Sequence, residues 1–141
     1  MIIIDTSGLL AALDGSDGRH AAAAAALRAS GSPRLLSPFV LAELDYLLAT
    51  RVSSTAERAM LAEVAGGAYQ LEPFGGDDIA GALAVLERYP DLELGIADAS
   101  LVVLADRYQV NDILTLDERH FRTVLGARGR KFRILPADSA A

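Results

Sequence analysis

A fully apolar run at the N-terminus, Met1 to Ile4, ends directly at Asp5. Its isoleucines leave no polar face, which is typical of a strand in a parallel sheet that helices cover on both sides. The following Asp5-Thr6-Ser7 consists of residue types that begin helices, and it predicts a helix over Ser7–Leu13. The N-terminus therefore predicts the strand–helix unit of an α/β fold.

Further short apolar segments alternate with helical segments along the chain. Strands are predicted over Arg34–Leu36, Tyr69–Glu72, Ile113–Thr115 and Phe132–Leu135. Helices are predicted over Arg19–Ala29, Pro38–Arg51, Ser54 to the Gly66-Gly67 pair, Asp77 to the residue before Pro90, Ile96–Tyr108 and Asp117–Val124. This alternation predicts a mainly parallel sheet of four to five strands with helices on both faces. The 141 residues contain no linker or repeat, so we expect a single domain over residues 1–141.

Composition excludes several classes of protein and of site. The chain has no cysteine and only two histidines, His20 and His120. Disulfide scaffolds, thiol catalysis and zinc sites built from thiolates or several histidines are therefore excluded. No apolar run approaches the roughly 18 residues that span a bilayer, and no basic segment precedes the first apolar run. We expect a cytoplasmic protein without a membrane segment or signal peptide.

The charge distribution is uneven. The net charge of −6 argues against binding nucleic acid through bulk charge alone. Residues 117–141 nevertheless carry a net charge of +3, and their six basic residues are Arg119, Arg122, Arg128, Arg130, Lys131 and Arg133. This segment is either a solvated basic tail or a local contact for phosphate groups, and the charges alone leave both interpretations open.

Several acids stand where ligand sites form in parallel α/β folds, at the carboxyl ends of strands. Asp5 ends the first predicted strand, Asp117 follows the fourth, and Asp98 begins a helix after a glycine. Each of these three acids could also simply cap a helix. Glu43 and Asp45 lie inside the helix after the second strand, and both have apolar neighbours at helical spacing, so periodicity does not choose between them.

Carboxylates that converge need a proton or a cation between them. Two carboxylates about 4 Å apart repel each other by about 4 kcal/mol at an effective dielectric constant near 20. Oxygen ligands without thiolates favour Mg²⁺ or Mn²⁺. Such ions activate water and stabilise charge in phosphoryl displacement, which makes phosphodiester hydrolysis chemically reasonable. The residues predict an acidic metal site and do not identify its substrate.

Four sequence blocks resemble the PIN-domain ribonucleases, specifically the VapC toxins of type II toxin–antitoxin systems. The blocks are MIIIDTSGLLA, SPFVLAELDYLL, GIADASLVVLADRY and ILTLDERHF. They cover almost the whole chain, in order and with the spacing of the family. The resemblance implies a PIN domain, which is a three-layer α/β/α sandwich around a parallel sheet.

The resemblance also implies a set of site residues. Asp5, Glu43, Asp98 and Asp117 would form an acidic Mg²⁺ site, which Mn²⁺ could also occupy, and the family pattern selects Glu43 over Asp45. Asp5 and Asp98 would be the central metal ligands. Glu43 and Asp117 would complete the site directly or through water.

Other polar residues receive secondary roles. By the same resemblance, Thr6 and Thr115, and more weakly Ser7, would orient the carboxylates or water at the metal. His120 follows the last acid closely, and we expect it to have a surface or packing role. The C-terminal residues that could contact the RNA backbone outside the acidic centre are Arg128, Arg130 and Lys131.

The resemblance implies a Mg²⁺-dependent endoribonuclease toxin that cuts structured RNA, either tRNA or rRNA, and inhibits translation. It also implies a cognate VapB-type antitoxin and a homodimer. One alternative is a non-catalytic PIN-fold module that binds RNA or protein. The other is an aspartate-based phosphotransfer domain, although the Asp5-Thr6-Ser7 segment lacks the adjacent acid pair that such a domain needs.

Overall fold

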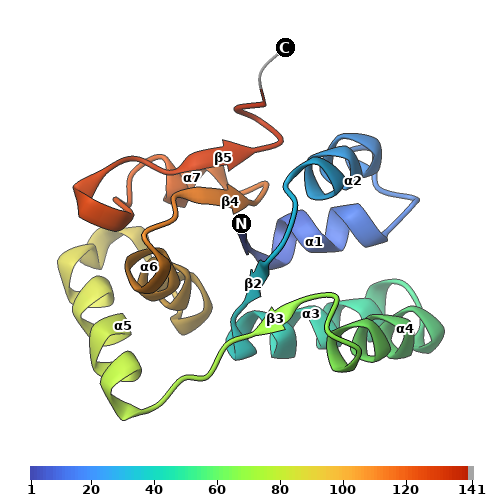
Figure 1. The fold of residues 1–141 in the computed structure, drawn as a ribbon, viewed down its shortest axis with the longest axis horizontal. Coiled ribbons are helices and arrows are strands. Elements are labelled where there is room, and N and C mark those ends of the chain that lie inside the picture. Colours follow the sequence, from blue (N-terminus) through green and yellow to red (C-terminus); the bar gives the residue numbers. More distant parts are fainter. Residues whose placement is uncertain (140–141) are drawn as a thin grey trace.

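Five parallel strands form the central layer of the computed structural model, which describes residues 1–139 (Figure 1). The strands are β1 (Ile2–Ile4), β2 (Arg34–Leu36), β3 (Gln70–Leu71), β4 (Asp112–Leu114) and β5 (Arg133–Leu135). Their order is β3-β2-β1-β4-β5, so β1 is the middle strand and pairs with β2 and β4. This sheet confirms the predicted α/β fold class and has the larger of the predicted strand numbers.

Helices cover both faces of the sheet. They are α1 (Thr6–Leu13), α2 (His20–Ala29), α3 (Pro38–Arg51), α4 (Ser54–Ala65), α5 (Gly76–Arg88), α6 (Ile96–Tyr108) and α7 (Glu118–Phe121), with short 3₁₀ turns η1 (Pro90–Leu92) and η2 (Ala127–Gly129). Figure 1 shows α1, α2 and α4 on one side of the strands and α5 and α6 on the other. The result is the expected three-layer α/β/α sandwich.

Close packing of α1 against β4 shapes the carboxyl edge of the sheet. A methyl group on Gly8 of α1 would lie 2.5 Å from the carbonyl oxygen of Leu114, so only glycine permits this approach. The backbone N–H of Asp5 donates to the same carbonyl oxygen at 3.0 Å. The start of α1 is therefore held against the residues that follow β4.

The helix predicted to end at Val124 is shorter in the structure. α7 ends at Phe121. The chain then turns back on itself, and Leu125 and Lys131 form an isolated antiparallel bridge. Helix-type hydrogen bonds still continue from the N–H of Arg122 to the carbonyl of Glu118 and from the N–H of Val124 to the carbonyl of His120, so the predicted end lies close to where this bonding stops.

Four strands also differ from their predicted bounds, of which β1 begins at Ile2 and β5 at Arg133, each one residue later than predicted. The strand expected over Tyr69–Glu72 is reduced to Gln70–Leu71, since β3 is an edge strand with β2 as its one neighbour. The fourth strand ends at Leu114, which leaves Thr115 beyond the strand. Within residues 1–139, no helix has the length and apolar character that a membrane crossing requires.

Candidate metal centre

The carboxylate of Asp5 stands at the end of β1, and only 5% of the residue is exposed. Its Oδ2 accepts hydrogen bonds from Thr115 Oγ1 at 2.6 Å and from Ser7 Oγ at 3.3 Å. Asp5 is the residue that precedes α1, but its side chain makes no capping hydrogen bond to that helix. Helix capping therefore does not explain the acid at this position.

The electrostatic surroundings of Asp5 disfavour its charged form. Burial raises the pKa of the Asp5 carboxyl from 3.8 to about 6. The hydrogen bond from Thr115 acts in the opposite direction, whereas the negative charges of Asp98 and Asp117 raise the pKa further. No lysine or arginine in the described part of the chain forms an ion pair with Asp5. The carboxylate is thus buried without a compensating cation.

Two hydroxyl groups connect Asp5 to the turn after β4. Thr115 Oγ1 donates to Asp5 and accepts a hydrogen bond from the backbone N–H of Asp117 at 2.9 Å. Ser7 Oγ lies 3.2 Å from Thr115 Oγ1 and accepts a hydrogen bond from the backbone N–H of Leu116 at 3.0 Å. Thr6 is equally buried, but its Oγ1 has no hydrogen-bond partner within residues 1–139. The side chains of Ser7 and Thr115 thus contact the acid directly, whereas Thr6 contacts it through its backbone, which lowers the pKa of Asp5.

His120 holds both carboxylate oxygens of Asp117. The backbone N–H of His120 donates to Oδ1 at 3.0 Å, and the Nδ1 atom of the imidazole lies 2.7 Å from Oδ2. This contact was not predicted from the sequence. The one sequence feature that could have indicated the contact is the spacing of three residues between Asp117 and His120. An acid that precedes a helix faces the third residue of the first turn.

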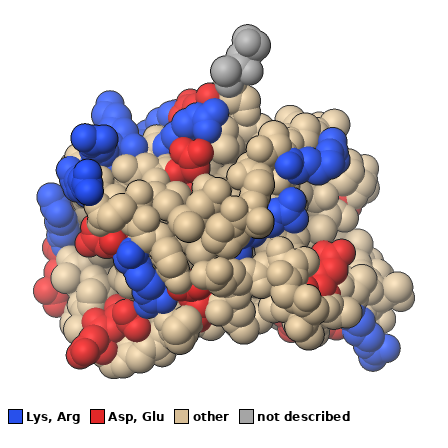
Figure 2. Space-filling view, in the orientation of Figure 1, with Lys and Arg blue, Asp and Glu red and all other residues tan. Residues whose placement is uncertain are grey.

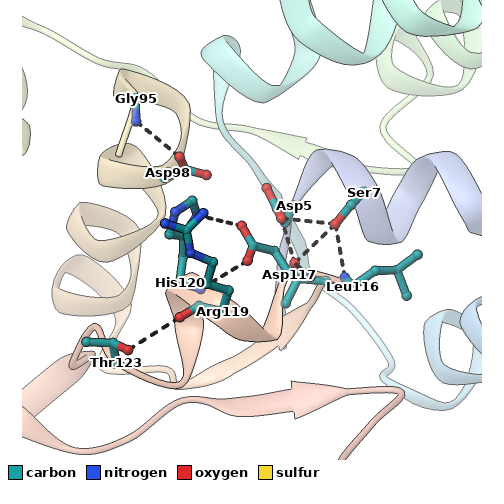
Figure 3. Close-up of polar contacts among 10 residues, drawn as sticks. Asp5, Ser7, Gly95, Asp98, Leu116, Asp117, Arg119, His120 and Thr123 are labelled. Carbon is teal, nitrogen blue, oxygen red and sulfur yellow. Dashed lines mark hydrogen bonds and ion pairs between the residues drawn. The ribbon is translucent and has the colours of Figure 1, made fainter. Parts of the chain in front are cut away.

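Asp98 lies in the first turn of α6, where its Oδ2 accepts a hydrogen bond from the backbone N–H of Gly95 at 3.1 Å. Figure 3 shows the side chains of Asp5, Asp98 and Asp117 pointing toward one another. Asp98, Asp117 and His120 each offer one ligand atom, and these atoms all lie within 4.8 Å of one another. Residues far apart in the sequence therefore converge on one small volume.

Glu43 stands apart from this group. Its side chain is exposed on α3 and makes no hydrogen bond or ion pair within residues 1–139. Asp45, the other acid of that helix, lies beside Glu57 of α4, and the contact raises the pKa of Glu57. The structure brings Asp5, Asp98 and Asp117 together and leaves both acids of α3 outside the cluster.

The donor set of the cluster fits a divalent cation. Carboxylate oxygens and imidazole nitrogens both bind divalent metals. Nε2 of His120 and Oγ1 of Thr6 are buried polar atoms without partners in the described part of the chain. Orphaned polar atoms and an uncompensated buried carboxylate are both conditions that a bound ion relieves. The acidic cluster can therefore hold a metal ion.

Arg119 lies at the acidic cluster next to His120 (Figure 3), whereas three other basic residues of the C-terminal segment lie away from it. Arg128, Arg130 and Lys131 are exposed in and after η2, and Arg128 donates to Oε1 of Gln109 at 2.8 Å. Figure 2 shows lysine and arginine side chains gathered over the segment between α7 and β5. The basic patch is thus a surface separate from the acidic cluster.

Known proteins share both the sequence and the fold. The PIN domain family matches residues 2–125. Ribonuclease VapC26 of Mycobacterium tuberculosis is 47% identical over 135 residues, which are 96% of this chain and all of the relative. The crystal structure of VapC20 from the same species, a sarcin–ricin loop cleaving toxin, superimposes with a TM-score of 0.75 at 27% identity and covers 83% of this chain and 90% of that one.

A more distant structure shares the fold. A toxin–antitoxin complex from Klebsiella pneumoniae gives a TM-score of 0.71 at 16% identity, and the match covers 90% of this chain and 95% of that one. The family match, the 47% identity and the converging acids agree with the resemblance of the four sequence blocks. The chain belongs to the PIN-domain family and, within it, to the VapC proteins.

Proposed function

We propose that this VapC protein is a Mg²⁺-dependent endoribonuclease that acts as a toxin. The observation that carries the proposal is the convergence of Asp5, Asp98 and Asp117 at one edge of the sheet, with a buried carboxylate that has no lysine or arginine partner within residues 1–139. The names of VapC26, a ribonuclease, and of VapC20, a sarcin–ricin loop cleaving toxin, support this activity. Hydrolysis of an RNA phosphodiester is the chemistry that such an acidic centre serves best.

Asp5 and Asp98 would be the central ligands of Mg²⁺ or Mn²⁺, and Asp117 would complete the site. A divalent cation there supplies positive charge to the phosphodiester and lowers the pKa of water. Glu43 would join directly or through water, because its exposed side chain has several rotatable bonds and no partner in the described chain that holds it elsewhere.

The surrounding side chains keep the acids in place. Thr115 and Ser7 donate hydrogen bonds to Asp5, which fixes the direction of its remaining lone pairs. His120 holds Asp117 through two hydrogen bonds, so this carboxylate cannot rotate freely. We assign Thr6 a weaker role, as a buried hydroxyl that orients water near Asp5. The protein therefore brings its acids to the substrate already oriented.

The biological setting follows from the same proposal. We expect residues 1–141 to act as one PIN domain in the cytoplasm, to form a homodimer, and to be neutralised by a cognate VapB-type antitoxin. The RNA substrate would be a structured tRNA or rRNA, and its cleavage would inhibit translation. Arg128, Arg130 and Lys131 would contact the RNA backbone outside the acidic centre, since they are exposed on one surface.

The test is cleavage of total cellular RNA by antitoxin-free protein, with Mg²⁺ or with EDTA. Discrete cuts, mapped by sequencing, are expected in Mg²⁺ and not in EDTA. Asp98→Asn removes a negative ligand at constant size and should abolish the cuts. Asp77→Asn is the matched control, because Asp77 is an exposed acid in the first turn of α5.

Cuts that persist in EDTA or in Asp98→Asn would contradict the proposal. Metal-loaded, folded protein that binds RNA but never cuts it would identify a non-catalytic module instead. Labelling of Asp5 by acetyl phosphate would identify a phosphotransfer domain.

A further inference from the structure

A hollow of about 280 Å³ opens beside the acidic cluster. Ser7, Leu116 and Asp117 form its inner wall, and Arg19 and Arg51 line it from other segments of the chain. Ser7 also donates to Asp5, so the hollow and the cluster share this wall. Whatever occupies the cluster has the hollow as its immediate neighbour.

Two arginines, Arg19 and Arg51, and two aspartates, Asp17 and Asp117, line the hollow. Arg19, before α2, pairs with Asp17 at 3.2 Å. Arg51 is the last residue of α3 and is exposed, and no carboxylate in the described part of the chain forms an ion pair with it. Other arginines, such as Arg107 and Arg122, each pair with two acids. Arg51 thus presents an uncompensated guanidinium beside the acidic cluster.

We propose that this hollow binds a backbone phosphate of the RNA strand, next to the phosphodiester at the acids. The inference rests on the proposed ribonuclease function and names a contact of its substrate. An RNA strand whose scissile group lies at the acids carries another phosphate within one nucleotide on each side. A guanidinium fits a phosphate with two parallel hydrogen bonds.

The remaining lining suits a backbone contact better than recognition of a base. Leu10 and Leu116 are apolar and offer contact to a sugar, and the hollow holds no aromatic side chain on which a base could stack. The chain has a net charge of −6 and repels a polyanion as a whole, so attachment of RNA near the acids depends on local cations such as Arg51. Arg51 is the principal contact, and Arg19 supports it.

A second hollow indicates the direction in which the strand continues. It measures about 220 Å³ and is lined by Arg19, Leu116 and Thr115 together with Pro136. Arg19 and Leu116 line both hollows, so Arg19 stands between them. Glu118 also lines the second hollow, so Arg19 is its one basic side chain, and an RNA strand that continues from Asp117 into this hollow would pass Arg19.

The test measures RNA binding without cleavage, in the Asp98→Asn background. The probe is fluorescein-labelled oligouridine, because a phosphate contact does not depend on base identity. Arg51→Gln should weaken binding about fivefold and reduce the slope of log K against log salt by about 0.7, the value for one phosphate on a single strand. Arg51→Lys keeps the charge and should preserve the slope while losing part of the affinity.

The matched control is Arg58→Gln, an exposed arginine of α4 that is not part of either hollow. It should change the affinity less than twofold. Melting temperatures of all variants verify that they are folded. Arg51→Gln that binds oligouridine as tightly as Arg58→Gln would overturn the proposal. So would Arg51→Gln that weakens binding of the cognate antitoxin and leaves RNA binding unchanged, because the hollow would then serve a protein partner.

Failure of this proposal can be told apart from failure of the ribonuclease function. If only the hollow is wrongly assigned, Asp98→Asn still abolishes cleavage while Arg51→Gln binds RNA like its control. If the function is wrong, either the wild-type protein makes no metal-dependent cuts or the cuts persist in Asp98→Asn, whatever Arg51 does.

Discussion

Asp5 and Glu72 are two buried acids at the same edge of one parallel sheet, and their surroundings are opposite. Each follows a strand, β1 or β3, and each is at most 5% exposed. Arg107 lies 3.0 Å from Glu72 and also pairs with Asp78. Tyr108 and Gln70 donate further hydrogen bonds to Glu72. Asp5 receives two hydroxyl hydrogen bonds and has acids as its charged neighbours.

The pKa values of the two acids follow these surroundings. Burial alone would raise the pKa of Glu72, but the hydrogen bonds from Tyr108, Gln70 and Arg107 outweigh it and lower the pKa. Burial raises the pKa of Asp5 to about 6. Arg107 compensates the charge of Glu72, whereas the charge of Asp5 is available to a bound cation. Burial of an acid therefore does not by itself distinguish a structural role from a functional one, whereas its partners do.

Replacing the two acids should give the largest effects, on the cleavage rate at Asp5 and on the free energy of unfolding at Glu72. Asp5→Asn should lower the cleavage rate by about 1,000-fold or more, because it removes charge from the reacting centre. Its free energy of unfolding at pH 7 should stay constant or rise, since no charge remains to be buried. Glu72→Gln should lower the free energy of unfolding by about 3 kcal/mol, as it leaves Arg107 poorly compensated.

Urea unfolding and initial cleavage rates, measured on both variants, check this pair of effects. Glu72→Gln should still cleave at a temperature at which it is folded. The comparison fails if Asp5→Asn is the unstable variant or Glu72→Gln the inactive one.

The pH dependence of stability should also have opposite signs at the two acids. Asp5 binds its proton more tightly in the folded chain than in the unfolded one, so protonation stabilises the fold. This stabilisation is complete below pH 3.8 and is lost as the pH rises through about 6. The free energy of unfolding that protonation of Asp5 contributes below pH 3.8, and that is lost at neutral pH, amounts to about 3 kcal/mol. The stabilisation from Glu72, whose pKa is lowered, is instead present at neutral pH and lost as the pH falls.

Unfolding in EDTA between pH 3.5 and 7 tests this sign, with the wild-type chain compared with Asp5→Asn. The wild type should lose about 3 kcal/mol relative to the variant as the pH rises. If the difference in the free energy of unfolding between the two proteins stays constant with pH, the pKa of Asp5 is not raised in the folded chain.

Gly8→Ala should disturb the packing of α1 beside Asp5 without replacing an acid. The added methyl group would meet the Leu114 carbonyl oxygen, which belongs to the backbone and cannot rotate away. We expect a loss of about 2 kcal/mol in the free energy of unfolding, and a lower cleavage rate because Thr115 follows Leu114 directly. Gly81→Ala is the control, since its methyl group would meet Val103 at an ordinary 3.5 Å. Equal stabilities of the two variants in thermal unfolding would contradict the close packing of α1.

His120 should give the smallest effect, because it acts through Asp117. His120→Leu removes the donor at 2.7 Å and should reduce cleavage about tenfold. His120→Asn places an amide donor near the same position and should recover most of the rate. The effect should appear in kcat rather than in KM, since the contact orients an acid. Equal losses in both variants would indicate that His120 has a packing role only.

The fold was predictable from the sequence to the extent that it depends on local patterns. Ile2–Ile4 could be assigned as a buried strand because three adjacent apolar β-branched residues suit few other environments. The strand order depends on contacts between distant segments, and no local pattern encodes it. The end of α7 was placed three residues too far along the chain, although helix-type hydrogen bonds continue to Val124.

The acids were predictable by position, and the family resemblance named Ser7 and Thr115 as their hydroxyl partners, but the charged partners of the acids were not predictable. The ends of β1 and β4 were expected to bring Asp5 and Asp117 together, since parallel strands end at one edge. The difference between Asp5 and Glu72 was not visible, because Arg107 comes from α6, far along the chain from β3. The hollow beside the cluster was missed likewise, because its arginines come from separate segments.

Calorimetric titration of Mn²⁺ into metal-free protein at pH 7 tests most directly whether the acids around Asp5 form a metal centre. The wild-type chain and Asp77→Asn should bind Mn²⁺ with the same affinity. Asp5→Asn and Asp98→Asn should bind it at least about tenfold more weakly while remaining folded. Equal affinities in all four proteins would contradict the account.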